Sequence, residues 1–437
     1  MANSKKGTTL TLPTALIDQC KQTYQTENQS QAINTALSDY LLLPYDEQIL
    51  DSFAIHQLLP DIEDRKTAQG ITLRLDSNLR KIMDKLSKQD TLSETAQMMI
   101  SRTLYAKQRG LSVSSNTSLL YILGNKRNSM MQAAIKNIKD TAQDVNWQTS
   151  VETCAGVLGI YANFKFADKE IVNDNDWRKI NLYRAIQENP RKLVILARAL
   201  NVDSATFNVQ MSLLDATEHT AKVNYEAAAA YLYLNRNSYL HNETSLDTKA
   251  SQQRYHKVLE AIAPLHQRMN QTGSSARATR FQNMDLLKII EKYRRQKNVL
   301  FIVDPPYLDT DYYNNKAKSD DAVSDNTEPD DAVSDNTEPD DAKFGDAEHE
   351  ELAHLLYLAK KNNGNDFIYF CRITAAKRDQ KKPNAEEWDR HMKGRIDDMY
   401  HGHGFYYMDV DLDDATTERI ITSFDFEDAK PYGREVR

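Results

Sequence analysis

The stretch that decides the fold is Asn298-Val-Leu-Phe-Ile-Val-Asp-Pro-Pro-Tyr307. Its five consecutive apolar residues, 299–303, predict a β-strand that is buried on both faces, as in the middle of a parallel sheet. Asp304 then stands at the carboxyl end of that strand, which is the edge of an open α/β sheet where ligands bind. We therefore expect a site there, although the same residues could also form a plain strand-terminating turn.

The residue types at 304–307 suit chemistry on an exocyclic amine of a nucleobase. The lone pair of such an amine is delocalised into the ring, so acceptors on its hydrogens help to make it nucleophilic. The carboxylate of Asp304 and the carbonyl of Pro305 can be those acceptors, and Tyr307 can stack on a base that is flipped out of the duplex. Pro305 and Pro306 fix the backbone and donate no N–H. Asp304, Pro305, Pro306 and Tyr307 are the candidate catalytic residues.

Other strands are expected on both sides of this one along the chain. They are predicted near residues 150–154, 170–173, 367–371, 405–410 and 418–426, with helical patterns between them, including a helix after Gly159. This alternation predicts an α/β fold with an open, mostly parallel sheet. The segment Val151–Gly159 contains two glycines that let a backbone approach a ligand, and Asp174 places a carboxylate after the next strand, suited to ribose hydroxyls.

In this order, the motifs between residues 119 and 426 resemble the Dam-like DNA adenine methyltransferases. The segments that carry the resemblance are Gly124-Asn-Lys126, Val151–Gly159, Asn173–Asn189, Ala227–Arg236, Phe281–Asp285, Asp304–Tyr307, Phe344–His349 and Glu418–Phe424. The resemblance implies a Rossmann-like domain that binds S-adenosylmethionine and methylates N6 of a flipped adenine at specific sites in double-stranded DNA, with no metal. It implies cofactor contacts by Lys126, Cys154, Ala155, Gly156, Gly159, Asp174, Asp285 and Asp304, and DNA contacts by Asn235 and Arg236.

The sequence departs from the family pattern in the segment that follows the first of these strands. Thr153-Cys154 replaces the usual Pro-Phe, and Leu158 replaces the usual second glycine. The stretch after Arg236 also differs, so the resemblance predicts no recognition sequence. Two alternatives stay open: methylation of cytosine at N4, and a catalytically silent DNA-binding regulator that keeps a degenerate methylase fold.

The first part of the chain contains a diverged repeat. Thr9-Leu-Thr-Leu-Pro13 aligns with Thr72-Leu-Arg-Leu-Asp76 at an offset of 63 residues. Each copy is predicted to form a short strand and two helices, the first of them over residues 14–26 and 77–88, and Ser30 and Ser93 are expected to cap the second helices. A strand followed by two helices resembles the ribbon-helix-helix DNA-binding family.

In that family two strands pair into an antiparallel ribbon that enters the major groove. The pair could form within this chain or through a homodimer. The side chains expected on the DNA side of the ribbon are Thr9, Thr11, Thr72 and Arg74, and those expected in the core are Leu10, Leu12, Leu73 and Leu75. The alternative is a small oligomerisation module that does not contact DNA.

A perfect acidic repeat interrupts the region after the catalytic motif. Asp321–Asp330 recurs as residues 331–340, and residues 320–341 carry ten acids and no base. The chain has a net charge of −8, so the remainder carries about +2 and the global charge does not exclude DNA binding. We interpret the repeat as a tolerated duplication in a solvated loop; an acidic mimic of DNA phosphates or a protein-docking tail is the alternative.

These patterns divide the chain into predicted parts. They are a first repeat copy at 1–43, a linker at 44–70, a second copy at 71–112, and a methyltransferase domain at 113–437 that contains a helical target-recognition insertion at 190–280 and an acidic loop at 316–343. The three cysteines are far apart in the sequence and no apolar run is long enough to span a membrane, so we expect a cytoplasmic protein. The expected partners are double-stranded DNA and a cognate restriction endonuclease.

The remaining candidates carry less information. Tyr312 could touch DNA or pack against the protein. The basic run 292–297 is interpreted as a solvated face, and the histidines at 349, 354, 401 and 403 as ordinary surface residues, because no ligand partners accompany them in the sequence.

Overall fold

The structure is a computed structural model. It describes residues 7–43, 67–87, 90–108, 119–120, 126–241, 243–270, 279–307, 344–374, 385–413 and 416–432. Four features that the sequence predicts lie outside these residues: Gly124 and Asn125, the boundary near 110–117, Tyr312, and the acidic loop at 316–343.

The chain forms two compact units. The first comprises residues 1–123 and 177–271, and the second comprises residues 124–176 and 272–437. The helical insertion, predicted at 190–280, therefore begins at residue 177 and belongs to the same unit as the N-terminal repeat. Each unit is described separately below.

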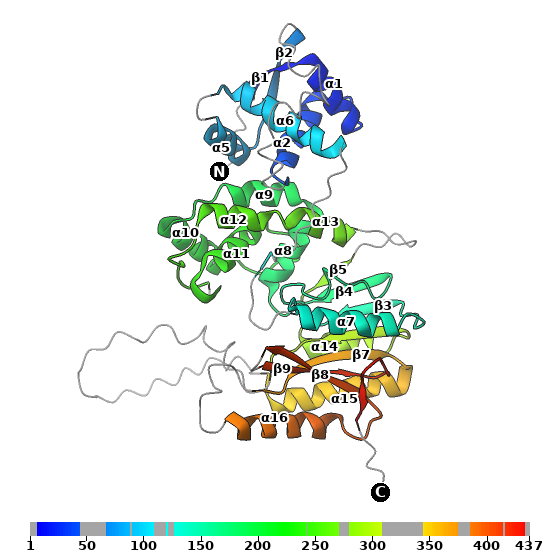
Figure 1. Ribbon diagram of the computed structural model, residues 1–437. Helices are drawn as coiled ribbons and strands as arrows, with labels where there is room; N and C mark the ends of the chain where they lie inside the picture. The colour runs from blue at the N-terminus through cyan, green and yellow to red at the C-terminus, as the bar shows by residue number, and fades with distance from the viewer. Residues whose placement is uncertain are drawn as a thin grey trace, which may run out of the picture. The chain divides into compact units, whose positions relative to one another are not determined.

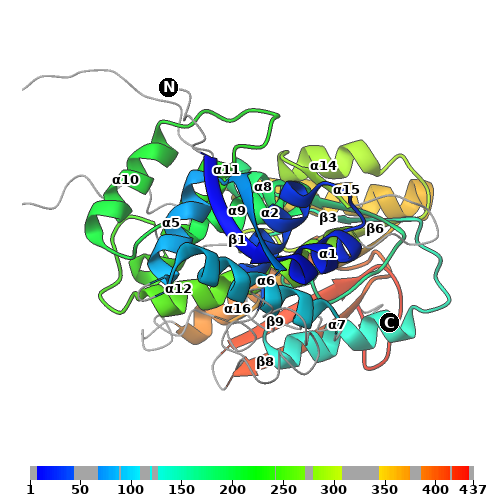
Figure 2. The same ribbon diagram turned by 90° about the horizontal axis from the view of Figure 1, so that it is seen from above.

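The N-terminal repeat forms a two-stranded ribbon within one chain. Strands β1 (Gly7–Pro13) and β2 (Ala68–Arg74) pair antiparallel (Figure 2). The burial alternates as predicted: Leu10, Leu12, Leu73 and Leu75 are buried, whereas Thr9, Thr11, Thr72 and Arg74 are exposed. The second strand begins inside the predicted linker, at Ala68.

The register of the ribbon has the symmetry of a dimer. Thr9 pairs with Thr72, its equivalent in the repeat, and Thr11 pairs with Gly70 as Gly7 pairs with Arg74. A local two-fold axis therefore passes between Thr9 and Thr72, and the chain itself supplies the pairing that a homodimer would otherwise provide.

Two helices follow each strand of the ribbon. They are α1 (Thr14–Thr23) and α2 (Gln29–Tyr40) after β1, and α5 (Ser77–Leu86) and α6 (Leu92–Gln108) after β2. The predicted serine caps are each wrong by two residues. Asn28 caps α2 by accepting from the Gln31 amide at 3.0 Å, and Thr91 forms a reciprocal pair with Glu94 at the start of α6. Ser93 instead accepts from the Thr11 amide at 2.9 Å and so ties β1 to α6.

The rest of the first unit is helical. Its elements are α8 (Trp177–Glu188), α9 (Pro190–Arg198), α10 (Ser204–Asp215), α11 (Tyr225–Asn237), η2 (Tyr239–His241), α12 (Gln252–Leu259) and α13 (Ile262–Asn270). The repeat is joined to them by polar contacts: Arg191 of α9 pairs with the buried Asp39 of α2, and Lys85 donates to Asn201 at 2.9 Å. The repeat is thus fastened to the helices rather than tethered beside them.

The second unit is built on an eight-stranded sheet in the order β10-β8-β9-β7-β6-β3-β4-β5. The strands are β3 (Thr149–Glu152), β4 (Lys169–Asn173), β5 (Arg280–Gln282), β6 (Val299–Val303), β7 (Asp366–Arg372), β8 (Tyr406–Asp413), β9 (Thr416–Thr422) and β10 (Lys430–Pro431). Strands β7, β6, β3, β4 and β5 are parallel, and β9, β8 and β10 continue the sheet antiparallel. The prediction of an α/β fold with a mostly parallel sheet is confirmed; the three-residue strand β5 was not predicted.

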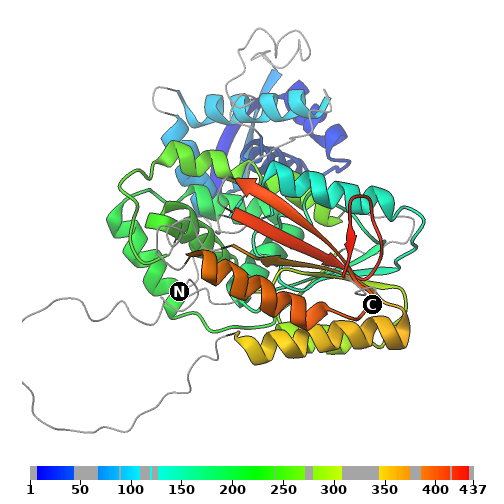
Figure 3. The same ribbon diagram turned by 60° about the horizontal axis from the view of Figure 1, so that its bottom comes forward.

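Helices cover both faces of this sheet (Figure 1). On one face, α7 (Ser129–Thr141) packs with Leu300, Ile302 and Phe370. On the other, α14 (Leu286–Tyr293), α15 (Asp346–Asn363) and α16 (Ala385–Tyr400) pack over Phe301 and Tyr369, and Figure 3 shows α15 and α16 beside the red strands of the antiparallel end. All five residues of β6 are buried, as the apolar run predicts. Within the described residues, no helix combines the length and hydrophobicity that crossing a membrane requires.

Candidate active site

The candidate site lies at the carboxyl edge of the parallel strands. The chain runs outward from β3 through β4 to β5 and then returns to β6 on the other side of β3, so the strand order reverses between β3 and β6. Open α/β sheets bind ligands at such a reversal. Because these strands are parallel, the residues that follow them, including Thr153, Asp174 and Asp304, share this edge.

Two asparagines tie together the connections that leave this edge. Asn173, at the end of β4, donates to the carbonyls of Thr153 and Met284, each at 2.9 Å. Asn283, just after β5, donates to the carbonyls of Asp174 and Asn175, each at 2.8 Å. The loops after three neighbouring strands are therefore fixed to one another.

The loop after β3 holds several of the predicted cofactor residues. The Gly156 amide donates to Asp174 Oδ2 at 2.9 Å, and the amide of Ala155, which is buried, donates to the Asn173 carbonyl at 2.7 Å. Gly156 has φ +49° and a Cβ there would meet nothing within 4 Å, so the backbone borders open space. Cys154 is partly exposed beside it.

Leu158 has a backbone conformation that usually requires glycine. It has φ +59°, the left-handed region that glycine enters freely and leucine enters only at a cost of about 1–3 kcal/mol. Its side chain is buried, and packing offsets part of that cost. The expected helix after Gly159 is absent from these described residues, which form successive turns instead, so no helix N-terminus is directed at this loop.

Gly159 has a packing role that the sequence did not reveal. A Cβ at this position would lie 3.2 Å from the backbone nitrogen of Lys126, closer than side chains normally come. Gln132 of α7 bridges the two segments by donating to the carbonyls of Gly159 and Lys126. Gly159 therefore allows the segment that carries Lys126 to lie against the loop.

Lys126 is at the centre of a buried polar cluster with Asp304, Tyr307 and Glu418. Its ammonium lies 2.8 Å from Asp304 Oδ1 and 3.2 Å from Glu418 Oε2, and it donates to the Tyr307 hydroxyl at 2.6 Å. The Tyr307 hydroxyl in turn donates to Glu418 Oε1 at 2.7 Å. The side chains of Lys126 and Glu418 are 2% and 3% exposed, whereas that of Asp304 is 24% exposed. Asp304 is thus the member of the cluster that solvent or a ligand can reach.

The cluster changes the acidity of its members. Burial raises the pKa of Asp304 from 3.8 to about 6; Lys126 opposes this rise and the charge of Glu418 adds to it. Burial lowers the pKa of Lys126, but Asp304 and Glu418 outweigh that effect and leave it above its usual value. At neutral pH Lys126 is therefore charged, and Asp304 is mostly an ionised acceptor.

A buried histidine also contacts the segment that follows β6. His349 of α15 is buried, and its Nε2 lies 3.1 Å from the Pro306 carbonyl. A carbonyl only accepts, so Nε2 carries the proton and Nδ1 can accept from the Tyr369 hydroxyl at 3.2 Å. The interpretation of His349 as an ordinary surface residue is wrong, whereas His354, His401 and His403 are exposed as expected.

Other predicted site residues have structural duties or lie in the first unit. Asp285 caps α14 by accepting from the amides of Leu287 and Lys288 at 3.0 and 3.1 Å. Asp174 accepts from the amides of Gly156 and Asp176, at 2.9 and 3.0 Å. In α11 of the first unit, Asn235 is 2% exposed and so is not available for a direct DNA contact, which corrects that expectation; Arg236 is partly exposed.

Two residues of the site were not identified from the sequence, although signals for both exist. His349 precedes Leu352 and Leu356 at helical spacing, which places it on the apolar face of α15. Glu418 precedes Arg419, Ile420 and Ile421 in the predicted terminal strand, where a buried carboxylate needs a partner. Neither signal names the partner, because Lys126 and Pro306 are distant in sequence.

No metal-binding group of three or more histidine, cysteine, aspartate or glutamate side chains occurs among the described residues. Comparison with known proteins adds no relative, since neither a protein-family profile nor a curated sequence matches this chain.

Proposed function

We propose that this protein is a DNA adenine-N6 methyltransferase whose second unit is a Rossmann-like domain that uses S-adenosylmethionine. The observation that carries the proposal is the environment of Asp304. This carboxylate ends the central buried strand at the reversal of strand order, and one of its oxygens is held by Lys126. Within the described part of the chain its other oxygen has no hydrogen-bond partner, and the side chain is partly exposed.

A free acceptor at this position suits an amine substrate. Asp304 Oδ2 accepts one hydrogen of the target amine and the Pro305 carbonyl accepts the other, which localises the nitrogen lone pair. His349 engages the carbonyl of Pro306, the next residue, and so holds the backbone that presents the Pro305 carbonyl. The ring of Tyr307 stacks on the flipped base while its hydroxyl stays anchored to Lys126 and Glu418.

The residues at the sheet edge fit the cofactor. The open space beside Gly156 admits a ligand next to the backbone, and the buried Asn173 Oδ1 has no hydrogen-bond partner among the described residues. Asp174, Asp285 and Asp304 add carboxylate oxygens along the same edge. When bound, S-adenosylmethionine supplies a methyl group activated by its sulfonium sulfur. Positioning by these side chains provides much of the rate.

DNA recognition is proposed for the first unit. The outward face of the ribbon carries Thr9, Thr11, Thr72 and Arg74, and a single chain completes it. Arg236 and the exposed Tyr239, which lies just after α11, are further candidates for contacts to DNA. A restriction endonuclease acting at the same site remains a proposed partner of such an enzyme.

Two alternatives remain. Cytosine N4 is also an exocyclic amine, so the same acceptors would serve it. A silent DNA-binding regulator is favoured by one specific observation, namely that the residues after β3 form turns rather than a helix whose N-terminus faces the candidate cofactor site.

The test substitutes the free acceptor while sparing the fold. Asp304→Ala should abolish transfer of a radiolabelled methyl group from S-adenosylmethionine to DNA, and binding of the cofactor should remain measurable by calorimetry. The control is Asp411→Asn, because Asp411 is an exposed carboxylate on β8 of the same unit. Undiminished methylation by Asp304→Ala would contradict the proposal, and a wild-type protein that does not bind the cofactor would favour the regulator.

A further inference from the structure

The cluster around Lys126 contains one more negative charge than positive charge. Its ionisable members are the ammonium of Lys126 and the carboxylates of Asp304 and Glu418. Within the described residues, Glu418 contacts only Lys126 and the neutral hydroxyl of Tyr307, and Asp304 pairs only with Lys126. One cation therefore serves two carboxylates.

Such an imbalance is costly where water is excluded. Glu418 is 3% exposed and cannot recover its lost hydration from solvent, and a buried charge is tolerated only when it is paired and hydrogen-bonded. Two events can restore the balance: a carboxylate can take up a proton, or a cation can bind. Burial raises the pKa of Asp304 and the charge of Glu418 adds to this rise, so Asp304 is the carboxylate that the first event would protonate.

The surplus charge is accessible from one direction. Lys126 and Glu418 are closed off, but Asp304 is 24% exposed, and among the described residues its Oδ2 has no partner at the carboxyl edge of the sheet. A positive group that arrives at this edge meets the carboxylate of Asp304, with the field of Glu418 behind it. Fields in a poorly hydrated site act over several ångströms with little screening.

We propose that Glu418 makes this site selective for a cationic ligand over a neutral ligand of the same shape. The inference rests on the proposed function, in which the cationic ligand is the sulfonium of S-adenosylmethionine and the neutral one is S-adenosylhomocysteine. Glu418 is then a specificity-determining residue that favours the cofactor over the spent product. It acts through charge and through its hold on Lys126 and Tyr307, without touching the ligand.

The test compares dissociation constants of three probes for the full chain by calorimetry at pH 8. The probes are S-adenosylmethionine, S-adenosylhomocysteine, and sinefungin, whose amine provides a second cation that transfers no methyl group. Wild-type protein should bind both cationic probes more tightly than S-adenosylhomocysteine. In Glu418→Gln, which keeps the size of the side chain, the ratio of neutral to cationic dissociation constants should fall about tenfold.

The matched control is Asp411→Asn, which removes a carboxylate from the neighbouring strand at an exposed position and should leave the ratio unchanged. A ratio in Glu418→Gln equal to the wild-type ratio overturns the inference. If none of the probes binds the wild-type protein, the proposed function itself fails, which is a distinguishable result.

A second measurement on wild-type protein decides the matter if Glu418→Gln does not fold. Near pH 6, binding of a cationic probe should release a proton from Asp304, whose pKa is about 6, and binding of S-adenosylhomocysteine should not. Calorimetry in two buffers of different ionisation enthalpy measures this release. The other described titratable groups close to the cluster are Tyr307, His349 behind Pro306 and the buried Cys371. Equal proton release by cationic and neutral probes overturns the inference.

Discussion

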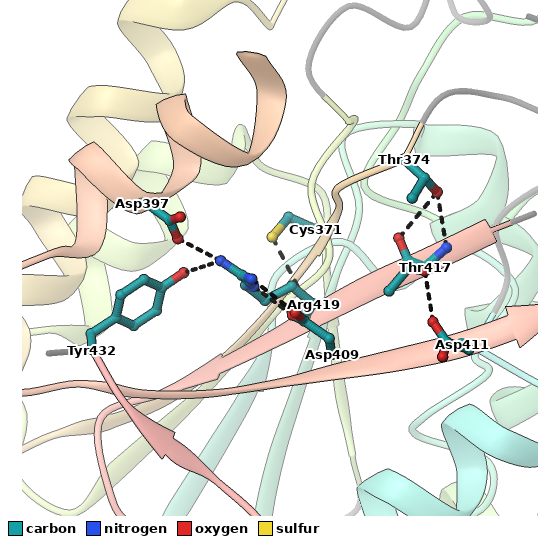
Figure 4. Close-up of polar contacts among 8 residues, drawn as sticks. All are labelled: Cys371, Thr374, Asp397, Asp409, Asp411, Thr417, Arg419 and Tyr432. Atoms are coloured by element: carbon teal, nitrogen blue, oxygen red, sulfur yellow. Dashed lines mark hydrogen bonds and ion pairs between the residues drawn. The ribbon is translucent and has the colours of Figure 1, made fainter. Parts of the chain in front are cut away.

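Two neighbouring residues of β9, Glu418 and Arg419, are both buried charges, but they point to opposite faces of the sheet and have opposite surroundings. Glu418 faces the side covered by α7 and shares one lysine with Asp304. Arg419 faces the side covered by α16, where carboxylates surround it on more than one side (Figure 4). The same strand therefore carries an open charge cluster on one face and a closed one on the other.

The closed cluster satisfies its cation completely. The guanidinium of Arg419 is fully buried and binds Asp409 through two hydrogen bonds of 2.6 and 2.9 Å. It also pairs with Asp397 of α16 and donates to the Tyr432 hydroxyl at 3.1 Å. These contacts join β8, β9, α16 and the segment of β10, so the cluster acts as a structural fastening.

The open cluster is arranged differently. Like the closed cluster it has two carboxylates for one cation, but Glu418 is only 3% exposed, whereas Asp397 and Asp409 are 36% and 29% exposed and meet solvent. Burial of a charge therefore does not by itself mark a functional site; a surplus carboxylate that is closed off from water, beside one that a ligand can reach, does.

The largest expected effect comes from breaking the closed cluster. Arg419→Met leaves Asp397 and Asp409 without their cation and should lower the free energy of unfolding by about 3 kcal/mol. Urea unfolding of the full chain measures this. Glu418→Gln is the matched substitution on the other face and should cause no such loss, because it removes a surplus charge. An equal loss in both variants would contradict the distinction between the clusters.

The open cluster should also be visible in the pH dependence of methylation. The pKa of Asp304 is raised to about 6, so this residue takes up a proton and loses its role as acceptor as the pH falls through 6. We expect kcat/KM to fall about tenfold per pH unit below that value. Glu418→Gln removes one of the causes that raise the pKa of Asp304. The pH below which kcat/KM falls should therefore be lower in this variant. A limb at the same pH in both proteins would argue against coupling of the two carboxylates.

The hydrogen bond between His349 and the Pro306 carbonyl should have a smaller effect on the rate of methylation. His349→Phe removes the donor to the Pro306 carbonyl, and we expect kcat to fall about tenfold, the worth of one hydrogen bond, with little change in cofactor binding. His349→Gln can restore a donor and should recover part of the loss. Equal loss in both variants, accompanied by a lower unfolding midpoint, would indicate a packing role alone.

The first unit also contains one arginine with a partner and one without a partner among the described residues. Substituting them should have the smallest effect, a change in affinity for DNA. Arg74 is exposed on the ribbon with no partner among the described residues, whereas Arg80 pairs with Asp84 and donates to Thr8. Arg74→Ala should weaken DNA binding about fivefold. It should also reduce the slope of the logarithm of the binding constant against the logarithm of salt concentration by about one. Arg80→Ala, the control of equal charge, should do less. Removing residues 1–112 tests DNA binding by the ribbon less cleanly, because it also removes Asp39, the ion-pair partner of Arg191 in α9.

The sequence predicted the parts of the fold that follow from local patterns. The apolar run before Asp304 predicted the central strand, and the alternation of Thr and Leu predicted both faces of the ribbon. The short strand β5 was missed because three residues have no recognisable period. The helix predicted after Gly159 does not form, since the left-handed conformation of Leu158 turns the chain instead.

The contiguous part of the candidate site was the easiest to predict. Asp304–Tyr307 are adjacent in the sequence, and their position at a strand end follows from the pattern. The family resemblance also singled out Lys126, but its contacts with Asp304, Tyr307 and Glu418 were not predicted, because only the fold brings these distant segments together. The sequence could therefore supply the acceptor but not the surplus charge beside it.

Asp304 and its neighbours are proposed to activate an adenine amine for methyl transfer. Mass spectrometry of nucleosides from DNA that has been incubated with the purified protein and S-adenosylmethionine tests this proposal most directly. We expect N6-methyladenine in DNA treated with wild-type protein and none in DNA treated with Asp304→Ala. N4-methylcytosine as the product, or no methylated base at all from active, cofactor-binding protein, would contradict it.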